Sequence, residues 1–215
     1  MDSEAVPVKR RYDASKRRQH AKATRDRVVE AAERRFARFG YTGTTVATVA
    51  ADAGVSAETV YKAFGGKAGI VRALYERGLA GIGPVPAPER LDARSARHLD
   101  AADVLRHWSQ LAVEVAPRAA PIALLARTAA ATDAEVAGLV KEMNAQRLER
   151  MAHNARWLRK HPGLCPRLKV AEIRDVLFVY TSAELYEALV LDQGWSLRRY
   201  GEFLRRGMCG QLLDR

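Results

Sequence analysis

The sequence predicts an all-α protein in two parts, a short N-terminal group of helices and a longer helical bundle after it. Three observations support this fold class. Apolar residues recur at three- and four-residue spacing through most of the chain, which is the period of an amphipathic helix. No stretch alternates long enough to predict a strand, and no repeat has a fixed period. Glycines and prolines fall between the periodic segments, where helices begin and end.

The first predicted helix covers residues 24–39. Gly40 follows its last apolar residue, and a glycine there readily adopts the left-handed conformation that closes a helix. The apolar residues share one face of the helix and are Val28, Val29, Ala32, Phe36 and Phe39.

Two shorter helices are predicted next, joined by a tight turn at Gly54. Thr45 suits the N-cap of the first, and Ser56 suits the N-cap of the second, because their hydroxyls accept from amides of the first turn. The apolar stripe of the first is Val46, Val49, Ala50 and Ala53. In the second, Val60 and Phe64 pack inward and leave Thr59, Tyr61, Lys62 and Ala63 on the other side.

This pair has the form of a helix-turn-helix. In such a motif the second helix places its N-terminal side chains against base edges in the major groove of DNA. Alanine at position 50 and branched residues at 49, 55 and 60 suit close packing of the two helices, because a larger residue at 50 would wedge them apart. The pattern therefore predicts a DNA-binding segment.

Residues 24–76, which run into a fourth predicted helix starting at Lys67, resemble the TetR (tetracycline-repressor-like) family of transcriptional regulators. Several motifs occur in the family's order and spacing, over about the first third of the chain. The resemblance implies that DNA phosphates are bound by Thr44, Thr45, Tyr61 and Lys67. It implies that the base-facing positions are Ser56, Ala57, Glu58, Thr59 and Lys62. Ala47 replaces a basic residue that many relatives carry, so part of the DNA contact must come from elsewhere.

The recognition residues allow a modest reading of base preference. Glu58 can accept from a cytosine amino group, Lys62 can donate to guanine, and the methyl of Thr59 can meet a thymine methyl. An equally good explanation of Glu58 is that it stabilises the positive end of the helix dipole. Ala57 offers no hydrogen bond, so we expect much of the recognition to depend on DNA shape.

A basic extension, residues 1–22, precedes this segment and supplies candidate DNA contacts at Arg17, Arg18 and Lys22. The chain of 215 residues has 36 Lys and Arg and 25 Asp and Glu, a net charge of +11. Residues 1–80 hold 16 basic and 9 acidic residues, net +7, which leaves +4 for the longer remainder. Basic side chains neutralise phosphates, so we expect DNA affinity to fall steeply with salt. The alternative is a tail that only increases solubility.

The segment 81–88 contains three prolines and marks the expected domain boundary, because proline lacks an amide donor. We therefore expect a DNA-binding domain over 23–80 and a ligand-binding and dimerisation domain over 99–215. Helices are predicted in that second domain over residues 103–115, 118–131, 133–160, 168–191 and 196–213.

The last two predicted helices suggest a homodimer. Their apolar stripes include the expected interface residues Leu185, Leu197, Tyr200, Leu204, Met208 and Leu212, although each of these residues could equally be core. A helix-turn-helix protein usually binds two half-sites of a palindromic operator, which requires a two-fold dimer. The resemblance implies that the final two helices supply it.

The resemblance also implies a cavity for a small hydrophobic effector in the second domain. The candidate lining residues are Trp108, Leu111, Met143, Arg147, Met151, Trp157 and Phe178, which suit a mostly apolar site with few polar anchors. Any one of them has ordinary core packing as its alternative.

Other function classes lack support in the sequence. No hydrolase, phosphate-binding, dinucleotide or zinc-protease motif occurs, so we expect neither an enzyme nor a cofactor. The histidines, and Cys165 and Cys209, lack metal-ligand spacing. No apolar run is long enough to span a membrane, and the N-terminus is charged, so we expect a cytoplasmic protein. The sequence thus predicts a ligand-responsive repressor that is released from DNA by its effector. The alternatives are a ligand-independent architectural DNA-binding protein and, with less support, an all-helical enzyme.

Overall fold

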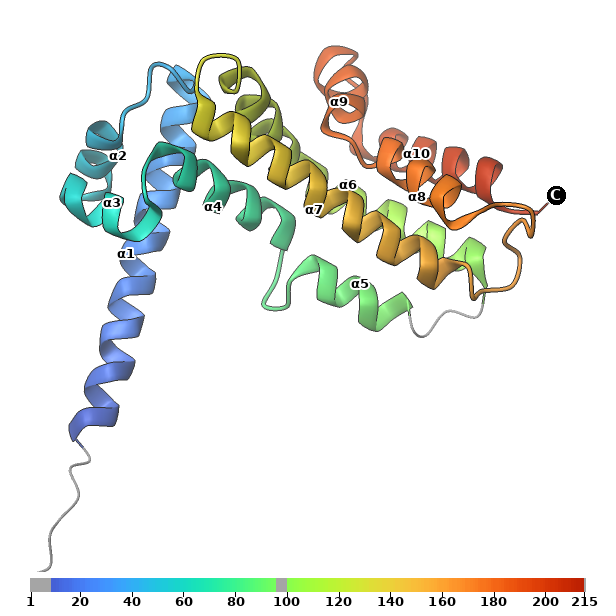
Figure 1. The fold of residues 1–215 in the computed structure, drawn as a ribbon, viewed down its shortest axis with the longest axis horizontal. Helices are drawn as coiled ribbons and strands as arrows, with labels where there is room; N and C mark the ends of the chain where they lie inside the picture. Colours follow the sequence, from blue (N-terminus) through green and yellow to red (C-terminus); the bar gives the residue numbers. More distant parts are fainter. Residues whose placement is uncertain (1–8, 96–99, 215) are drawn as a thin grey trace, which may run out of the picture. The chain divides into compact units, whose positions relative to one another are not determined.

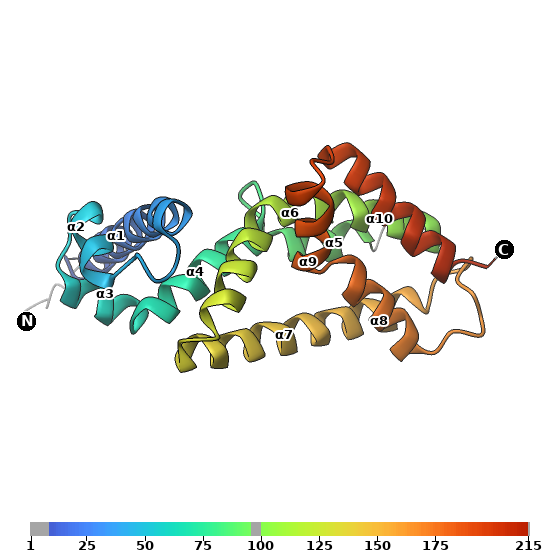
Figure 2. The same cartoon turned by 90° about the horizontal axis from the view of Figure 1, so that it is seen from above.

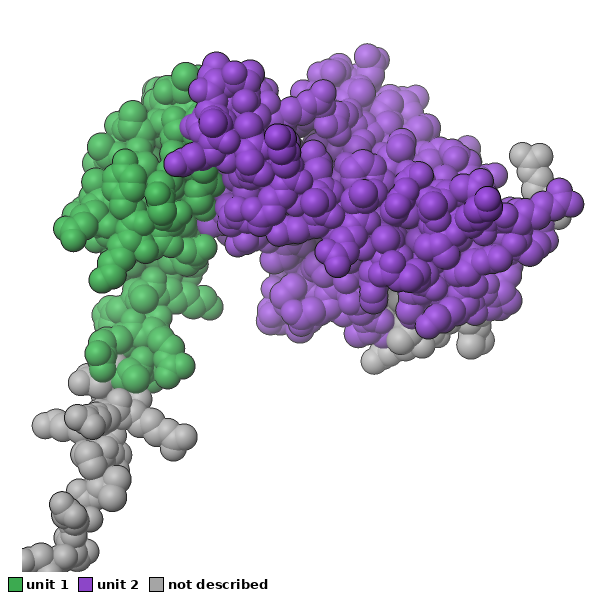
Figure 3. Space-filling model, in the orientation of Figure 1, with its two compact units in different colours: residues 1–70 green, residues 71–215 purple. Residues whose placement is uncertain are grey.

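The computed structural model describes residues 9–95 and 100–214 and consists of helices in both ranges (Figure 1). The predicted all-α fold is confirmed. The chain divides into two compact units, one up to Ile70 and the other from Val71 onward (Figure 3).

The first unit contains α1 (Lys9–Phe39), α2 (Val46–Ala53), α3 (Ala57–Phe64) and the start of α4 (Lys67–Ala80). One side chain or more from each helix is almost fully buried, and the core of the unit includes Val28, Phe36, Val49, Val60 and Ile70. These are mainly the positions that the helical period assigns to the inner faces. Phe39 is the exception, since it is 48% exposed.

Helix α1 is longer than expected, because it begins at Lys9 and not at Thr24. From Ser15 to Ala23 its side chains are exposed, so no apolar stripe announces a helix there. Its lysines, arginines, alanines and glutamine have high helix propensity, which accounts for its continuation. The expected extension over 1–22 is therefore largely a part of α1, and residues 1–8 lie outside the described ranges.

The second unit is built around α6 (Ala101–Ala129), which packs against α5 (Ala87–Ser95), α7 (Ala134–Leu158), α9 (Ala183–Tyr186) and α10 (Leu197–Leu212). Helix α7 runs beside α8 (Val170–Tyr180), as both views of the fold show (Figures 1 and 2). A π-helical turn, η1 (Glu187–Asp192), continues from α9. The largest fully buried side chains come from four of these helices and include Leu105, Leu158, Leu177, Tyr200 and Leu204.

Three predicted boundaries in this unit are wrong. Helix α5 was not predicted. Pro88 does not prevent it, because this proline stands in the first turn, where proline is tolerated. Helix α6 runs through Pro117 and Pro121, whereas a break was predicted after Val115. Residues buried before and after the prolines, including Trp108 and Ala126, hold both halves in one helix, and this packing outweighs a cost of ~3 kcal/mol per internal proline.

The helix predicted over 168–191 is broken after Tyr180. Thr181 leaves the helical conformation, and its hydroxyl donates to the carbonyl of Leu177. Ser182 then caps α9, since its hydroxyl accepts from the amide of Leu185 at 3.2 Å. A local side-chain cap thus competes with helix continuation at this point.

Candidate functional site

The turn between α2 and α3 has the geometry expected of a helix-turn-helix. Gly54 has φ 65° and ψ 42°, the left-handed conformation that favours glycine. Thr45 caps α2 in a reciprocal arrangement with Thr48, and the Ser56 hydroxyl accepts from the Thr59 amide at 3.1 Å. Ala50 is 2% exposed, so the two helices meet at a small side chain. Both predicted N-caps are confirmed.

The outer face of α3 is open to solvent. Tyr61 is 55% exposed, although its ring is large and partly apolar. Glu58 and Lys62 are exposed beside it, while Ala57 and Thr59 are half-buried. Ser56 is exposed at the start of the helix, with its hydroxyl 2.9 Å from that of Thr59. This face combines hydrogen-bonding groups with one basic residue, Lys62, and one acidic residue, Glu58. It carries no bulky aliphatic side chain.

Thr44 was expected to bind a DNA phosphate, but its side chain does not reach the surface of this chain. Thr44 is fully buried, and its hydroxyl donates to the carbonyl of Gly40 at 2.8 Å. Thr45, the next residue, is exposed. Threonine at position 44 therefore stabilises the loop after α1, and only Thr45 has its side chain at the surface.

Lys67 occupies a different position from the one expected. Its Nζ donates to the carbonyls of Tyr41 at 2.9 Å and Thr44 at 3.0 Å, and it lies 3.7 Å from the centre of the Tyr41 ring. The lysine is half-buried. It therefore joins the start of α4 to the loop between α1 and α2, a role that sequence reasoning missed.

Two arginines of α1 hold the short helices in place. The Arg25 guanidinium donates to the carbonyl of Ala63 at 3.0 Å and lies 4.4 Å over the Phe64 ring, so it stabilises the end of α3. Arg35 donates twice to Asp52 of α2, at 2.6 and 2.9 Å. This hydrogen bonding lowers the pKa of the Asp52 carboxyl. The helical spacing of apolar residues does not predict these contacts, because each one joins polar groups of two different helices.

The basic residues proposed for the extension fall on an exposed stretch of α1. Arg17, Arg18 and Lys22 are all exposed, and Arg18 also donates to the carbonyl of Ala14. The side chains of Lys9, Arg10 and Arg11 lie outside the described part of the chain. The charge is thus carried on a helix, which fixes the spacing between the cations.

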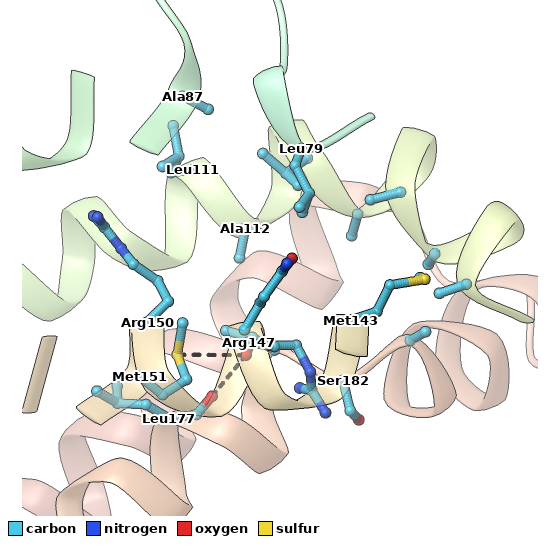
Figure 4. Close-up of a pocket in the computed structure, with 18 of the residues that line it drawn as sticks. Leu79, Ala87, Leu111, Ala112, Met143, Arg147, Arg150, Met151, Leu177 and Ser182 are labelled. Atoms are coloured by element: carbon cyan, nitrogen blue, oxygen red, sulfur yellow. Dashed lines mark hydrogen bonds between the residues drawn. The ribbon is translucent and has the colours of Figure 1, made fainter. Parts of the chain in front are cut away.

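The second unit contains a cavity of about 300 Å³, with side chains from α4 to α10 around it (Figure 4). Five of the seven expected residues line it: Trp108, Leu111, Met143, Arg147 and Met151. The other two do not. Trp157 packs against Trp108 at 6.2 Å and against His161 at 3.9 Å between ring centres, and Phe178 lies under Arg147.

Charged and hydrogen-bonding groups enter the mostly apolar wall at a few points. Arg127 pairs with Glu184 and Arg150 pairs with Asp92, each at 2.6 Å. Arg147 donates to the carbonyl of Phe178 at 2.7 Å, and burial lowers the pKa of its guanidinium. Burial raises the pKa of the Tyr75 phenol, which also lines the cavity. Sequence reasoning missed Tyr75 and Arg150, because nothing in the helical period distinguishes them.

Four of the six expected dimer residues are in the core of the second unit. Tyr200, Leu204, Met208 and Leu212 are at most 1% exposed and pack against the other helices of the same chain. Their stripe is the inner face of α10, so they are not available to a second copy. Leu185 is half-buried and Leu197 is 39% exposed.

Two further findings concern the described residues. They include no helix that is long and apolar enough to cross a membrane. They also include no group of three acidic, histidine or cysteine side chains arranged to hold a metal ion.

Comparisons with known proteins agree with this architecture. Residues 28–74 match the model of the bacterial regulatory proteins of the tetR family. Similar solved structures include the fatty acid degradation regulator FadR from Bacillus halodurans, with 17% identity, a TM-score of 0.67, and coverage of 89% of this chain and 97% of that one. NalD, the secondary repressor of a multidrug efflux pump in Pseudomonas aeruginosa, has 20% identity and a TM-score of 0.67, with 91% and 98% covered.

A regulator from Saccharomonospora viridis, solved in complex with choline, has 19% identity and a TM-score of 0.66, with 89% and 98% covered. A search of curated proteins gives no match. The chain thus has the all-helical fold of these solved regulators, with a helix-turn-helix at its N-terminal end. The helix-turn-helix region of the chain matches the tetR family model, as its motifs suggested, and the chain shares the fold of solved proteins described as members of that family.

Proposed function

We propose that the chain is a ligand-responsive repressor that binds a palindromic DNA operator as a dimer. The proposal depends mainly on the exposed outer face of α3, where Tyr61, Glu58 and Lys62 lie at the surface. Helix α3 is the second helix of the helix-turn-helix and is capped by Ser56. The family match over the same residues supports it.

In this proposal α3 enters the major groove. The positions that face bases are Ser56, Ala57, Glu58, Thr59 and Lys62, and the phosphate contacts come from Thr45 and Tyr61. Lys67 and Thr44 do not contact DNA through their side chains in this proposal. They stabilise the loop before α2 by donating to backbone carbonyls. The exposed cations Arg17, Arg18 and Lys22 of α1 add contacts to phosphates, which strengthen binding without reading sequence.

Dimerisation is proposed through the outer surface of α8, η1 and α10. The buried inner face of α10 is excluded, but exposed apolar side chains remain at Val179 of α8, Leu191 of η1 and Leu197 of α10. Exposed apolar residues on neighbouring elements are a common feature of subunit interfaces. A two-fold axis there would place one α3 on each half of a palindrome.

The effector is proposed to occupy the cavity of the second unit. Two of the solved proteins with this fold were determined with small molecules, choline in one and triclosan in the other, which supports a ligand-binding role for the fold. The volume of about 300 Å³ is at the lower end of ligand-binding pockets. A ligand releases the operator only if it binds the conformation that does not fit DNA more tightly than the one that does.

The decisive experiment is selection of bound fragments from the genomic DNA of the source organism, followed by titration of the purified fragment. We expect a preference of at least ~1000-fold over random DNA at physiological salt. An architectural DNA-binding protein would show little preference, and such a result would contradict the proposal. Tyr61→Ala should weaken binding to the selected fragment, while Tyr61 contributes little to stability because it is largely exposed.

A further inference from the structure

Three arginines line the cavity of the second unit, and they differ in their partners. Arg127 is paired with Glu184, and Arg150 is paired with Asp92. Within the described residues, Arg147 forms no ion pair. Of the three arginines, Arg147 therefore differs in having no carboxylate hydrogen-bonded to its guanidinium.

The position of Arg147 is fixed by the protein. Its guanidinium lies 3.5 Å over the centre of the Phe178 ring, and its Nη1 donates to the backbone carbonyl of Phe178 at 2.7 Å. These contacts use one face of the group and one of its five N–H donors. A planar guanidinium has two parallel donors that match the two oxygens of a carboxylate, so its remaining edge is suited to such a ligand.

The surroundings of Arg147 make an anion favourable. Burial lowers the pKa of the guanidinium, which means that the cation is partly removed from water. A buried charge is destabilising unless an opposite charge or strong hydrogen bonds compensate it. Tyr75 also lines the cavity and interacts electrostatically with Arg147, and its raised pKa keeps its phenol protonated as a second donor.

The remaining wall is apolar. Leu111, Met143, Met151 and Leu177 surround the cavity together with small alanine residues (Figure 4). A water molecule occupies ~30 Å³ in the liquid, so a volume of about 300 Å³ suits a ligand of roughly 10 to 15 non-hydrogen atoms. Glu184 attracts Arg147 electrostatically but is hydrogen-bonded to Arg127, so these three side chains together carry one net positive charge. One net positive charge matches one negative charge, which favours a carboxylate over a doubly charged phosphate ester.

We propose that the effector is an apolar monocarboxylate whose carboxylate binds Arg147 and whose apolar body fills the rest of the cavity. This inference rests on the proposed function, because it assigns the chemical class of the molecule that regulates DNA binding. It places Arg147 as a specificity residue, with Phe178 positioning it.

Isothermal titration calorimetry on the full-length protein at pH 7 tests the proposal with matched probes. Decanoate is compared with decanamide, and 4-phenylbutanoate with 4-phenylbutanamide, so that the charge changes while the apolar body does not. We expect the protein to bind at least one of the carboxylates roughly 10- to 100-fold more tightly than its amide, which is typical of hydrogen bonds to a charged group.

Variants identify the residue responsible. Arg147→Gln should remove the preference for the carboxylate, and Arg147→Lys should retain part of it, since lysine keeps the charge without the planar pair of donors. Arg150→Gln is the matched control, because it removes the same charge from the same cavity wall but from an arginine that is paired with Asp92. That control should keep the full preference.

Several results would overturn the proposal. They are failure of both carboxylates to bind, equal binding of carboxylate and amide, a preference that survives in Arg147→Gln, or one that disappears in Arg150→Gln. The comparison of carboxylate with amide needs no variant, so it decides the question even if Arg147→Gln does not fold. Because calorimetry is done without DNA, sequence-specific DNA binding with no carboxylate preference would reject this inference alone. Absence of specific DNA binding would reject the proposed function instead.

Discussion

The ammonium group of Lys67 lies 2.9 Å from the carbonyl oxygen of Tyr41 and 3.7 Å from the centre of the same residue's ring. One side chain at the start of α4 thus contacts both the backbone and the aromatic ring of the loop after α1. It also reaches the carbonyl of Thr44, the residue that precedes the N-cap of α2. Lys67 therefore fixes the entry to the helix-turn-helix.

Lys67→Met should destabilise the protein by about 1–3 kcal/mol, because two partly buried carbonyls lose a charged donor. The free energy of unfolding, measured in urea, is the readout. Lys62→Met is the control, since Lys62 is exposed on α3. That control should leave stability unchanged and weaken binding to the selected DNA fragment. If Lys67→Met is as stable as the parent and binds DNA weakly, Lys67 is a phosphate contact after all.

Tyr61→Phe should weaken binding to the selected DNA by a few-fold to about tenfold, through loss of one hydroxyl hydrogen bond. The hydroxyl is uncharged, so the salt dependence of binding should stay the same. Fluorescence anisotropy at several salt concentrations measures both quantities. A variant with unchanged affinity would remove Tyr61 from the set of DNA contacts.

Replacing Arg17, Arg18 and Lys22 together by alanine should flatten the salt dependence of DNA binding. Each phosphate contact contributes about 0.9 to the slope of log affinity against log salt, so three contacts predict a change of roughly 2 to 3. Alanine preserves the helix, because its propensity is the highest. Lys141, Arg156 and Lys160 are exposed in the second unit, and their triple replacement should leave the slope unchanged. Equal slopes in all three proteins would indicate that this part of α1 does not contact DNA.

Glu114 predicts a pH dependence of stability. Its carboxylate pairs with Arg90 and accepts from the amide of Ile82 at 2.7 Å, and these bonds lower its pKa below 4.5. A depressed pKa contributes stability above the unfolded value that is lost as the pH falls through the folded one. Glu114→Gln should therefore destabilise the protein by roughly 0.5–1 kcal/mol at pH 7, since the pair is partly exposed. The difference should shrink as the pH falls from the ordinary carboxyl value of 4.5 through the lower pKa of folded Glu114, and a pH-independent difference would contradict this role.

Gly207 and Gly210 give opposite predictions on one helix. A Cβ built at Gly207 collides with the ring of Tyr180, whereas nothing lies within 4 Å of one built at Gly210. Gly207→Ala should cost about 1–3 kcal/mol through overpacking. Gly210→Ala should stabilise the protein by up to roughly 1 kcal/mol, because alanine is the better helix former. The melting temperatures of the two variants, measured by thermal unfolding, compare these effects. A destabilised Gly210→Ala would show that another group lies against this position of α10.

Helical periodicity was sufficient to predict the fold class and the caps at Thr45 and Ser56, because burial and capping leave local signals. It failed where tertiary contacts decide the outcome. Thr44 and Lys67 were expected to contact DNA, but their side chains donate to backbone carbonyls of the loop between α1 and α2. The inner stripe of α10 was assigned to a subunit interface, since a periodic stripe does not show whether it faces its own chain or another.

The same limit applies to the cavity. Large residues on helical faces located five of its lining residues, but the pattern included Trp157, which packs elsewhere. The difference between Arg147 and the paired Arg127 and Arg150 depends on Glu184 and Asp92, which are distant in sequence. Charge partners across helices become visible only once the fold is known.

The two prolines inside α6 have a mechanical consequence. Proline has no amide hydrogen, so the carbonyls of Val113 and Pro117 receive no bond from the residue four positions later. Ala112, Val115, Ala116, Ala119 and Ala120, which border the cavity, lie along this same stretch. The helix is consequently easiest to bend beside the cavity, so a molecule that pressed on this stretch would change the direction of α6 with little breaking of hydrogen bonds.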